Sequence, residues 1–195
     1  MKHLRISVIA LSILAFISCK NQEKKEMEEN QEEMTESMTK EEMPMKKEVD
    51  FELASKSGST AMGKVSFVEE NGQVTFTARL YGLKPGIHAI HIHEKADCTA
   101  EDGTSSGGHW NPTFQPHGKW GDAGGYHLGD IGNFEANENG EGSITLTTDQ
   151  WCIGCGDANK DVLGKAIIVH EGADDFTSQP SGNAGARVSC GGIIE

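Results

Sequence analysis

Short runs of alternating apolar and polar residues, separated by turn signals, fill the chain from residue 51 onward. Two such runs lie in VSFVEENGQVTFTARLYGL and flank Asn71-Gly72, a pair typical of two-residue β-hairpin turns. Further runs follow in IHAIHIHE, GSITLTT and KAIIVH, and no long segment has the 3.6-residue period of a helix. The pattern predicts one all-β domain over residues 51–195, built as a β-sandwich or Greek-key barrel.

Residues 95–133 interrupt this pattern. The segment is rich in Gly, Pro and His and has no strand periodicity. A loop of this length in a compact domain is usually functional, or is held by a metal or a disulfide. We therefore expect functional side chains here.

The N-terminus has the pattern of an export signal. The basic start MKHLR precedes a largely apolar run over residues 6–17, which is too short to span a bilayer but suits a signal-peptide core. The run ends in Phe16-Ile17-Ser18-Cys19, which resembles a bacterial lipobox. We predict a signal peptide over residues 1–19, lipidation of Cys19, and attachment to a membrane in the periplasm or cell envelope. An ordinary signal peptide cleaved near Ser18 is the alternative.

Residues 20–50 differ in composition from the rest. They contain ten Glu and five Met but no Gly, Cys or Trp, and such a segment buries too little apolar surface to offset its chain entropy. We predict a disordered linker. Met27, Met34 and Met38 share one helical face, so copper(I) handling by thioethers is an alternative to methionine as simple filler.

Charge restricts the partners of the domain. Residues 51–195 carry 19 acidic and 9 basic side chains, a net charge of −10. Nucleic acid is therefore not an expected partner, because phosphate binding needs clustered Lys and Arg. An anionic substrate would need a local positive focus.

The stretch HAIHIHE holds three of the chain's eight histidines. On a strand, residues two apart face the same side, so His91 and His93 project together while Ile90 and Ile92 face the other way. Two imidazoles on one face suit a single metal ion. His88 has the other parity, and we expect a hydrogen-bonded packing histidine there.

Other potential ligands follow along the chain. His109, His117 and His127 lie in the long loop, Asp130 follows three positions after His127, and His170 ends the run AIIVH. Three His nitrogens and one Asp oxygen suit a closed tetrahedral zinc site. Several imidazoles with an open position suit copper.

Six separated blocks carry a family resemblance. They are HAIHIHE, GGHWNP, PHGKWGD, YHLGDIGN, IVHEGADD and GNAGARVSCGG. In type and order they resemble copper–zinc superoxide dismutase, over residues 51–195. The resemblance implies an eight-stranded Greek-key β-barrel or sandwich with long metal-binding and active-site loops.

The resemblance also implies a role for each residue. Copper would be held by His91, His93, His109 and His170, and zinc by His109, His117, His127 and Asp130, with His109 as the bridge. Asp174 would be the carboxylate that links copper and zinc ligands, Arg187 the active-site cation, and Cys98–Cys190 the disulfide.

The implied activity is disproportionation of superoxide anion to hydrogen peroxide and oxygen by redox cycling of copper, in a protein whose sequence is compatible with a homodimer. A non-catalytic copper-binding or delivery module on the same fold is the alternative. A thiol–disulfide oxidoreductase built on CIGC would need a βαβ pattern, which the sequence does not have.

Cys152 and Cys155 are not explained by the family. Once Cys19 is assigned to lipid and Cys98 to a bond with Cys190, these two cysteines remain, and a remaining pair in an exported protein favours a second, local disulfide. An accessory copper or zinc site and a pair of free or intermolecular thiols are the alternatives.

Overall fold

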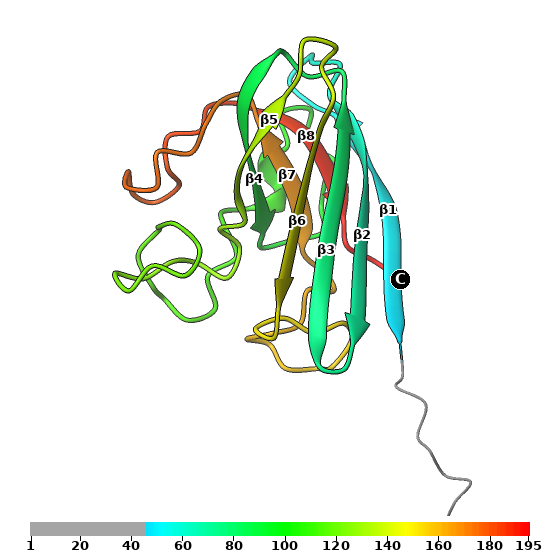
Figure 1. The fold of residues 1–195 in the computed structure, drawn as a ribbon, viewed down its shortest axis with the longest axis vertical. Coiled ribbons are helices and arrows are strands. Elements are labelled where there is room, and N and C mark those ends of the chain that lie inside the picture. The colour runs from blue at the N-terminus through cyan, green and yellow to red at the C-terminus, as the bar shows by residue number, and fades with distance from the viewer. Residues whose placement is uncertain (1–45) are drawn as a thin grey trace, which may run out of the picture. The chain divides into compact units, whose positions relative to one another are not determined.

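A computed structural model describes residues 46–195 (Figure 1). The predicted signal peptide, Cys19 and nearly all of the predicted linker lie outside these residues. The described part holds one short 3₁₀ helix and eight strands: β1 (Lys47–Ser55), β2 (Met62–Glu70), β3 (Gln73–Tyr81), β4 (Gly86–His93), η1 (Thr104–Ser106), β5 (Gly132–Ala136), β6 (Gly142–Thr148), β7 (Ala166–His170) and β8 (Arg187–Gly192). Among these residues no helix is long and apolar enough to cross a membrane.

The strands form a closed antiparallel barrel in the order β1-β2-β3-β6-β5-β4-β7-β8. The connections from β3 to β4 and from β6 to β7 join strands that are not neighbours, which is the Greek-key pattern. Closure pairs β1 with both β2 and β8, so no strand edge is left open. The all-β prediction from the alternating pattern is confirmed.

Alternation along the strands places the core inside the barrel. Phe67 on β2 and Phe76 on β3 are fully buried and pack against each other with ring centroids 5.1 Å apart. Trp151, from the β6–β7 loop, packs on both rings. Burial of one such side chain is worth about 1.5–3 kcal/mol, so these aromatic residues contribute strongly to the stability of the barrel.

The predicted hairpin turn is present between β2 and β3. Asn71 and Gly72 both have positive φ, 52° and 75°. A two-residue turn with both central residues in this region matches the right-handed twist of the strands, which is why Asn-Gly is favoured there.

The folded domain begins before residue 51. Strand β1 starts at Lys47, and Val49 and Leu53 are both buried. Residues 47–50 therefore belong to the barrel, although their charge resembles that of the preceding segment. Pairing of β1 with β2 and β8 supplies the burial.

Two long loops define the functional side of the barrel. One joins β4 to β5 and the other joins β7 to β8, and both extend from the same side of the barrel (Figure 1). The third long connection, between β6 and β7, packs at the barrel end beside the β2–β3 hairpin (Figure 1).

Candidate metal centre

Strand β4 presents two histidines on its outer face. Ile90 and Ile92 lie in the hydrophobic core, whereas His91 and His93 point to the outside of the barrel, as the alternation predicts. The loops cover them, because His91 is 0% exposed and His93 1% exposed. His170 comes from the end of β7, the strand next to β4, at a register irregularity between Val169 and His170.

His109 is brought to this face by the β4–β5 loop. A β-bridge pairs it with His93, and the backbone N–H of Trp110 donates to the carbonyl of Ile92 over 2.8 Å. The His109 ring centroid lies 4.0 Å from that of His91 and 5.0 Å from that of His93. Four histidines form a first set of potential metal ligands. Each offers one ring nitrogen, and these four atoms all lie within 4.8 Å of one another: His91, His93, His109 and His170.

A second set shares His109. Its members are His109, His117, His127 and Asp130, whose potential ligand atoms also lie within 4.8 Å of one another. The Asp130 carboxylate lies 2.8 Å from Nδ1 of His109, 3.0 Å from Nδ1 of His117 and 3.2 Å from Nδ1 of His127. The backbone N–H of His127 donates to Asp130 over 2.8 Å and holds the carboxylate in place. The imidazole of His109 therefore belongs to both sets.

The buried nitrogens fit metal ligation. Among residues 46–195, six buried side-chain nitrogens have no hydrogen-bond partner, and all belong to the two sets: Nδ1 of His91, His117 and His127, and Nε2 of His93, His109 and His170. A buried polar atom without a partner costs about 1–3 kcal/mol. Binding of cations by these lone pairs would remove that cost, so the residues present suit two metal ions.

The protonation state of three histidines in the first set favours metal binding, because burial keeps their imidazoles neutral. Burial lowers the pKa of His93 and His170 well below the usual value, and burial lowers the pKa of His109 to about 4. These imidazoles are neutral at pH 7, as metal ligands must be. His117 differs: burial lowers its pKa, but the adjacent carboxylates of Asp130 and Asp174 outweigh this and raise the pKa to about 9. Metal binding at the second set would release this proton.

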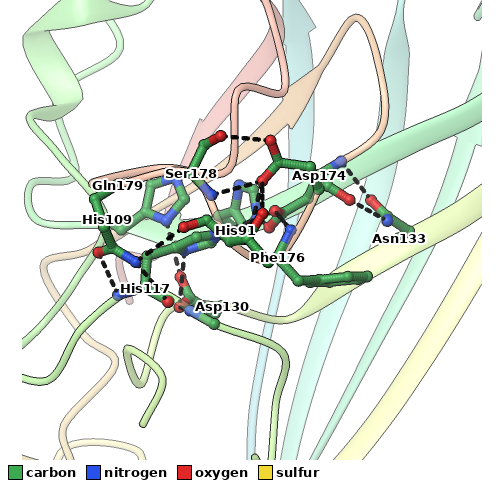
Figure 2. Close-up of polar contacts among 12 residues, drawn as sticks. His91, His109, His117, Asp130, Asn133, Asp174, Phe176, Ser178 and Gln179 are labelled. Carbon is green, nitrogen blue, oxygen red and sulfur yellow. Dashed lines mark hydrogen bonds and ion pairs between the residues drawn. The ribbon is translucent and has the colours of Figure 1, made fainter. Parts of the chain in front are cut away.

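Asp174 links the two sets. Its carboxylate accepts hydrogen bonds from Nε2 of His91 over 2.8 Å and from Nε2 of His117 over 2.9 Å (Figure 2). Asn133 on β5 exchanges two hydrogen bonds with the Asp174 backbone, which fixes the carboxylate between the rings. Each linked ring therefore has one nitrogen held and the other directed toward its set.

Arg187 lies at the start of β8, beside the first set. Its guanidinium donates to the carbonyl of Gly103 over 2.9 Å and to Oγ of Ser106 over 3.0 Å. Arg187 is paired with His170, a member of the first set, across β7 and β8. Ser106 and Gly103 were not anticipated from the sequence.

The other residues singled out in the sequence have defined positions. Cys98–Cys190 and Cys152–Cys155 are disulfides, with Cα atoms 5.8 Å and 5.9 Å apart. His88 is the predicted packing histidine: its ring nitrogens face the carbonyls of His170 and Lys84 at 2.9 Å and 2.8 Å.

Cys152 and Cys155 also lie near Asp161, in a third group of potential ligand atoms. The two sulfurs are bonded to each other, which agrees with the local disulfide and leaves no thiolate for a metal. Both oxygens of Asp161 accept backbone N–H groups of the same loop, from Gly154 and Gly156. Here the carboxylate shapes the loop.

Comparison with known proteins gives consistent matches. The family model of copper/zinc superoxide dismutase (SODC) matches residues 61–193. A SOD-like protein from Bacillus subtilis has a similar structure, with 31% sequence identity and a TM-score of 0.66 over 74% of this chain and 97% of that chain. A double mutant of a SOD-like protein from the same organism has 32% identity and a TM-score of 0.66 over 75% and 97%. The clock protein EA4 has 34% identity and a TM-score of 0.64 over 77% and 96%.

Proposed function

Since this chain belongs to the copper/zinc superoxide dismutase family, we propose that it disproportionates superoxide, with copper at the first ligand set and zinc at the second. Two superoxide anions and two protons give one dioxygen and one hydrogen peroxide. The observation that carries the proposal is the pair of complete ligand sets that share His109, with Arg187 beside the first.

Copper, when bound, would supply the reversible one-electron couple that the reaction needs and that zinc lacks. Nε2 of His109 faces the first set and Nδ1 faces Asp130 in the second. His109 is therefore the residue best placed to hold a proton, at Nε2, for delivery to peroxide. Its neutral state before metal binding follows from burial, which lowers its pKa to about 4.

Arg187 would attract the substrate. The domain carries a net charge of −10 over residues 51–195, so a superoxide anion meets an unfavourable average potential. A guanidinium held by Gly103 and Ser106 places positive charge beside the first set without further rearrangement. This would raise the local concentration of the anion.

A non-catalytic copper-binding module is less well supported. Copper storage or delivery would need only the first set. The second set, the Asp174 link and Arg187 would then be unused, although each is buried or held by specific hydrogen bonds.

We also propose that the protein is exported and attached to a membrane through Cys19. The support is the N-terminal pattern together with two disulfides in the domain, because disulfides persist mainly in oxidising compartments. Mass determination of a peptide containing Cys19, isolated from the producing cells, tests the lipid assignment.

Metal content and superoxide consumption, measured on one purified sample, test the activity. We expect one copper and one zinc per chain, loss of activity on metal removal by a chelator, and recovery on adding copper to the zinc-loaded protein. If fully loaded protein consumes superoxide no faster than metal-free protein, the catalytic proposal is wrong. Copper retention without activity would instead support the binding module.

A further inference from the structure

Gln179 holds the peptide group of a proposed zinc ligand from another loop. Its Oε1 accepts the backbone N–H of His117 over 2.8 Å, and its Nε2 donates to the backbone carbonyl of His117 over 2.9 Å (Figure 2). The two residues are 62 positions apart in sequence. The amide side chain thus pairs with this peptide much as a neighbouring β-strand would.

His117 depends on these contacts for its position. It is only 3% exposed and lies in a stretch of the β4–β5 loop without regular secondary structure. Within the described residues, its N–H and C=O have no hydrogen-bond partner other than Gln179. Without Gln179, two polar backbone groups of a largely buried residue would lose their partners.

Three contacts then fix His117. Gln179 holds its peptide, and Asp174 accepts a hydrogen bond from its Nε2 over 2.9 Å. The remaining ring nitrogen, Nδ1, lies 3.0 Å from Asp130, inside the second ligand set. Asp174 restricts rotation of the ring, whereas Gln179 fixes where the ring is attached.

The loop that carries Gln179 is braced by its own hydrogen bonds. Asp175 accepts the N–H and hydroxyl of Ser178, and Gly182 donates to the carbonyl of Ser178 over 2.7 Å. Asp174 accepts the N–H of Phe176 over 2.7 Å. The same braced segment therefore carries both groups that hold His117.

We propose that Gln179 is a positioning residue that couples the β7–β8 loop to the zinc site by fixing His117. The inference rests on the proposed binding of zinc at the second ligand set. It extends that proposal, because Gln179 is no metal ligand and controls how well one ligand is preorganised.

Two variants separate the two hydrogen bonds. Gln179→Met keeps a side chain of similar length and makes neither bond. Gln179→Glu can still accept the His117 N–H but, when ionised, cannot donate to the His117 carbonyl. Each lost bond of this kind weakens the held state by about 2- to 10-fold. We expect zinc release to a chromogenic chelator to be about 5- to 100-fold faster in Gln179→Met, with a smaller increase in Gln179→Glu.

Two controls separate positioning from general destabilisation. Gln115→Ala removes a side chain from the same loop as His117. Within residues 46–195, the only hydrogen bond of the Gln115 side chain is to the nearby carbonyl of Thr113, at 3.3 Å. We expect this variant to release zinc at the wild-type rate. Copper release should also be unchanged in both Gln179 variants, because within the described residues the Gln179 side chain makes no hydrogen bond to a residue that belongs to the first set alone.

Hydrogen exchange of the His117 amide gives a readout that needs no metal. In metal-free protein we expect protection in the wild type and in Gln179→Glu, and faster exchange in Gln179→Met. Unchanged exchange or unchanged zinc release in Gln179→Met overturns the inference. If the wild type binds no zinc while the exchange pattern is as expected, the proposed zinc site is wrong and Gln179 is a loop anchor only, which also overturns its role toward zinc.

Discussion

The two disulfides differ in loop length, and this difference predicts their contributions to stability. Cys98–Cys190 joins positions 92 apart, from the β4–β5 loop to β8, whereas Cys152–Cys155 joins positions 3 apart. In the chain-entropy model each disulfide contributes a constant and a term proportional to the logarithm of loop length. The constant cancels between the two, which leaves a difference of about 3 kcal/mol in favour of the long bridge.

Paired alanine variants measure this difference. Cys98→Ala with Cys190→Ala should lower the free energy of unfolding by about 4–5 kcal/mol, and Cys152→Ala with Cys155→Ala by about 2 kcal/mol or less. Each pair removes one buried sulfur, from Cys190 or Cys152, so the packing losses partly cancel in the comparison.

Urea unfolding of metal-free protein, followed by tryptophan fluorescence, gives the two values, because bound metals would add their own stabilisation. At about 2–4 °C per kcal/mol for a domain of this size, the two melting temperatures should differ by about 10 °C. Equal destabilisation by the two pairs, or a larger loss from the short one, would refute the loop-length reasoning.

Other predictions concern the metal sets and charge. His170→Ala should lose copper and activity but keep zinc, whereas Asp130→Ala should lose zinc first; elemental analysis of both decides, and loss of both metals in either variant would contradict the assignment. Arg187→Glu should slow superoxide consumption far more than Arg187→Lys with copper retained, and equal rates would count against attraction by Arg187. The gap should shrink above about 0.1 M salt, where interactions between exposed charges more than about 10 Å apart are largely screened. Burial raises the pKa of Asp130 and Asp174, but the adjacent histidines lower it by more, so the net pKa of each carboxyl lies below the usual 3.8. In metal-free protein the stabilisation that these two carboxylates provide is present above pH 3.8 and is lost as the pH falls from about 5 toward 2. The free energy of unfolding, measured by urea denaturation, should therefore decrease over this pH range, and it should decrease less steeply in Asp130→Asn.

Local backbone geometry explains what the sequence could predict. The side-chain period of a strand is two wherever the strand lies, so the sequence alone placed His91 and His93 on one face and Ile90 and Ile92 in the core. The same parity gave His88 its packing role. Asn71-Gly72 predicted its turn because positive φ is tolerated at these two residues.

The start of the domain shows where this local reading is insufficient. Val49 and Leu53 alternate with charged residues, as in an edge strand and equally in a charged linker. Residues 47–50 pair with residues 66–69 of β2, and β8, which lies far away in sequence, pairs with the other end of β1. Only strand pairing shows that residues 47–50 belong to the barrel.

The sequence by itself determined the alternating runs that form β2, β3, β4, β6 and β7, the residues able to bind metal and, through the spacing of its motifs, the family. It did not identify β1, β5 or β8 as strands. The tertiary structure decided how these residues are held: Asn133 braces Asp174, Ser106 orients Arg187, and Gln179 pairs with the peptide of His117. Each is a contact between distant segments that satisfies a polar group the fold has buried. Which groups become buried depends on how the loops return to the barrel, and no local pattern along the chain carries that information.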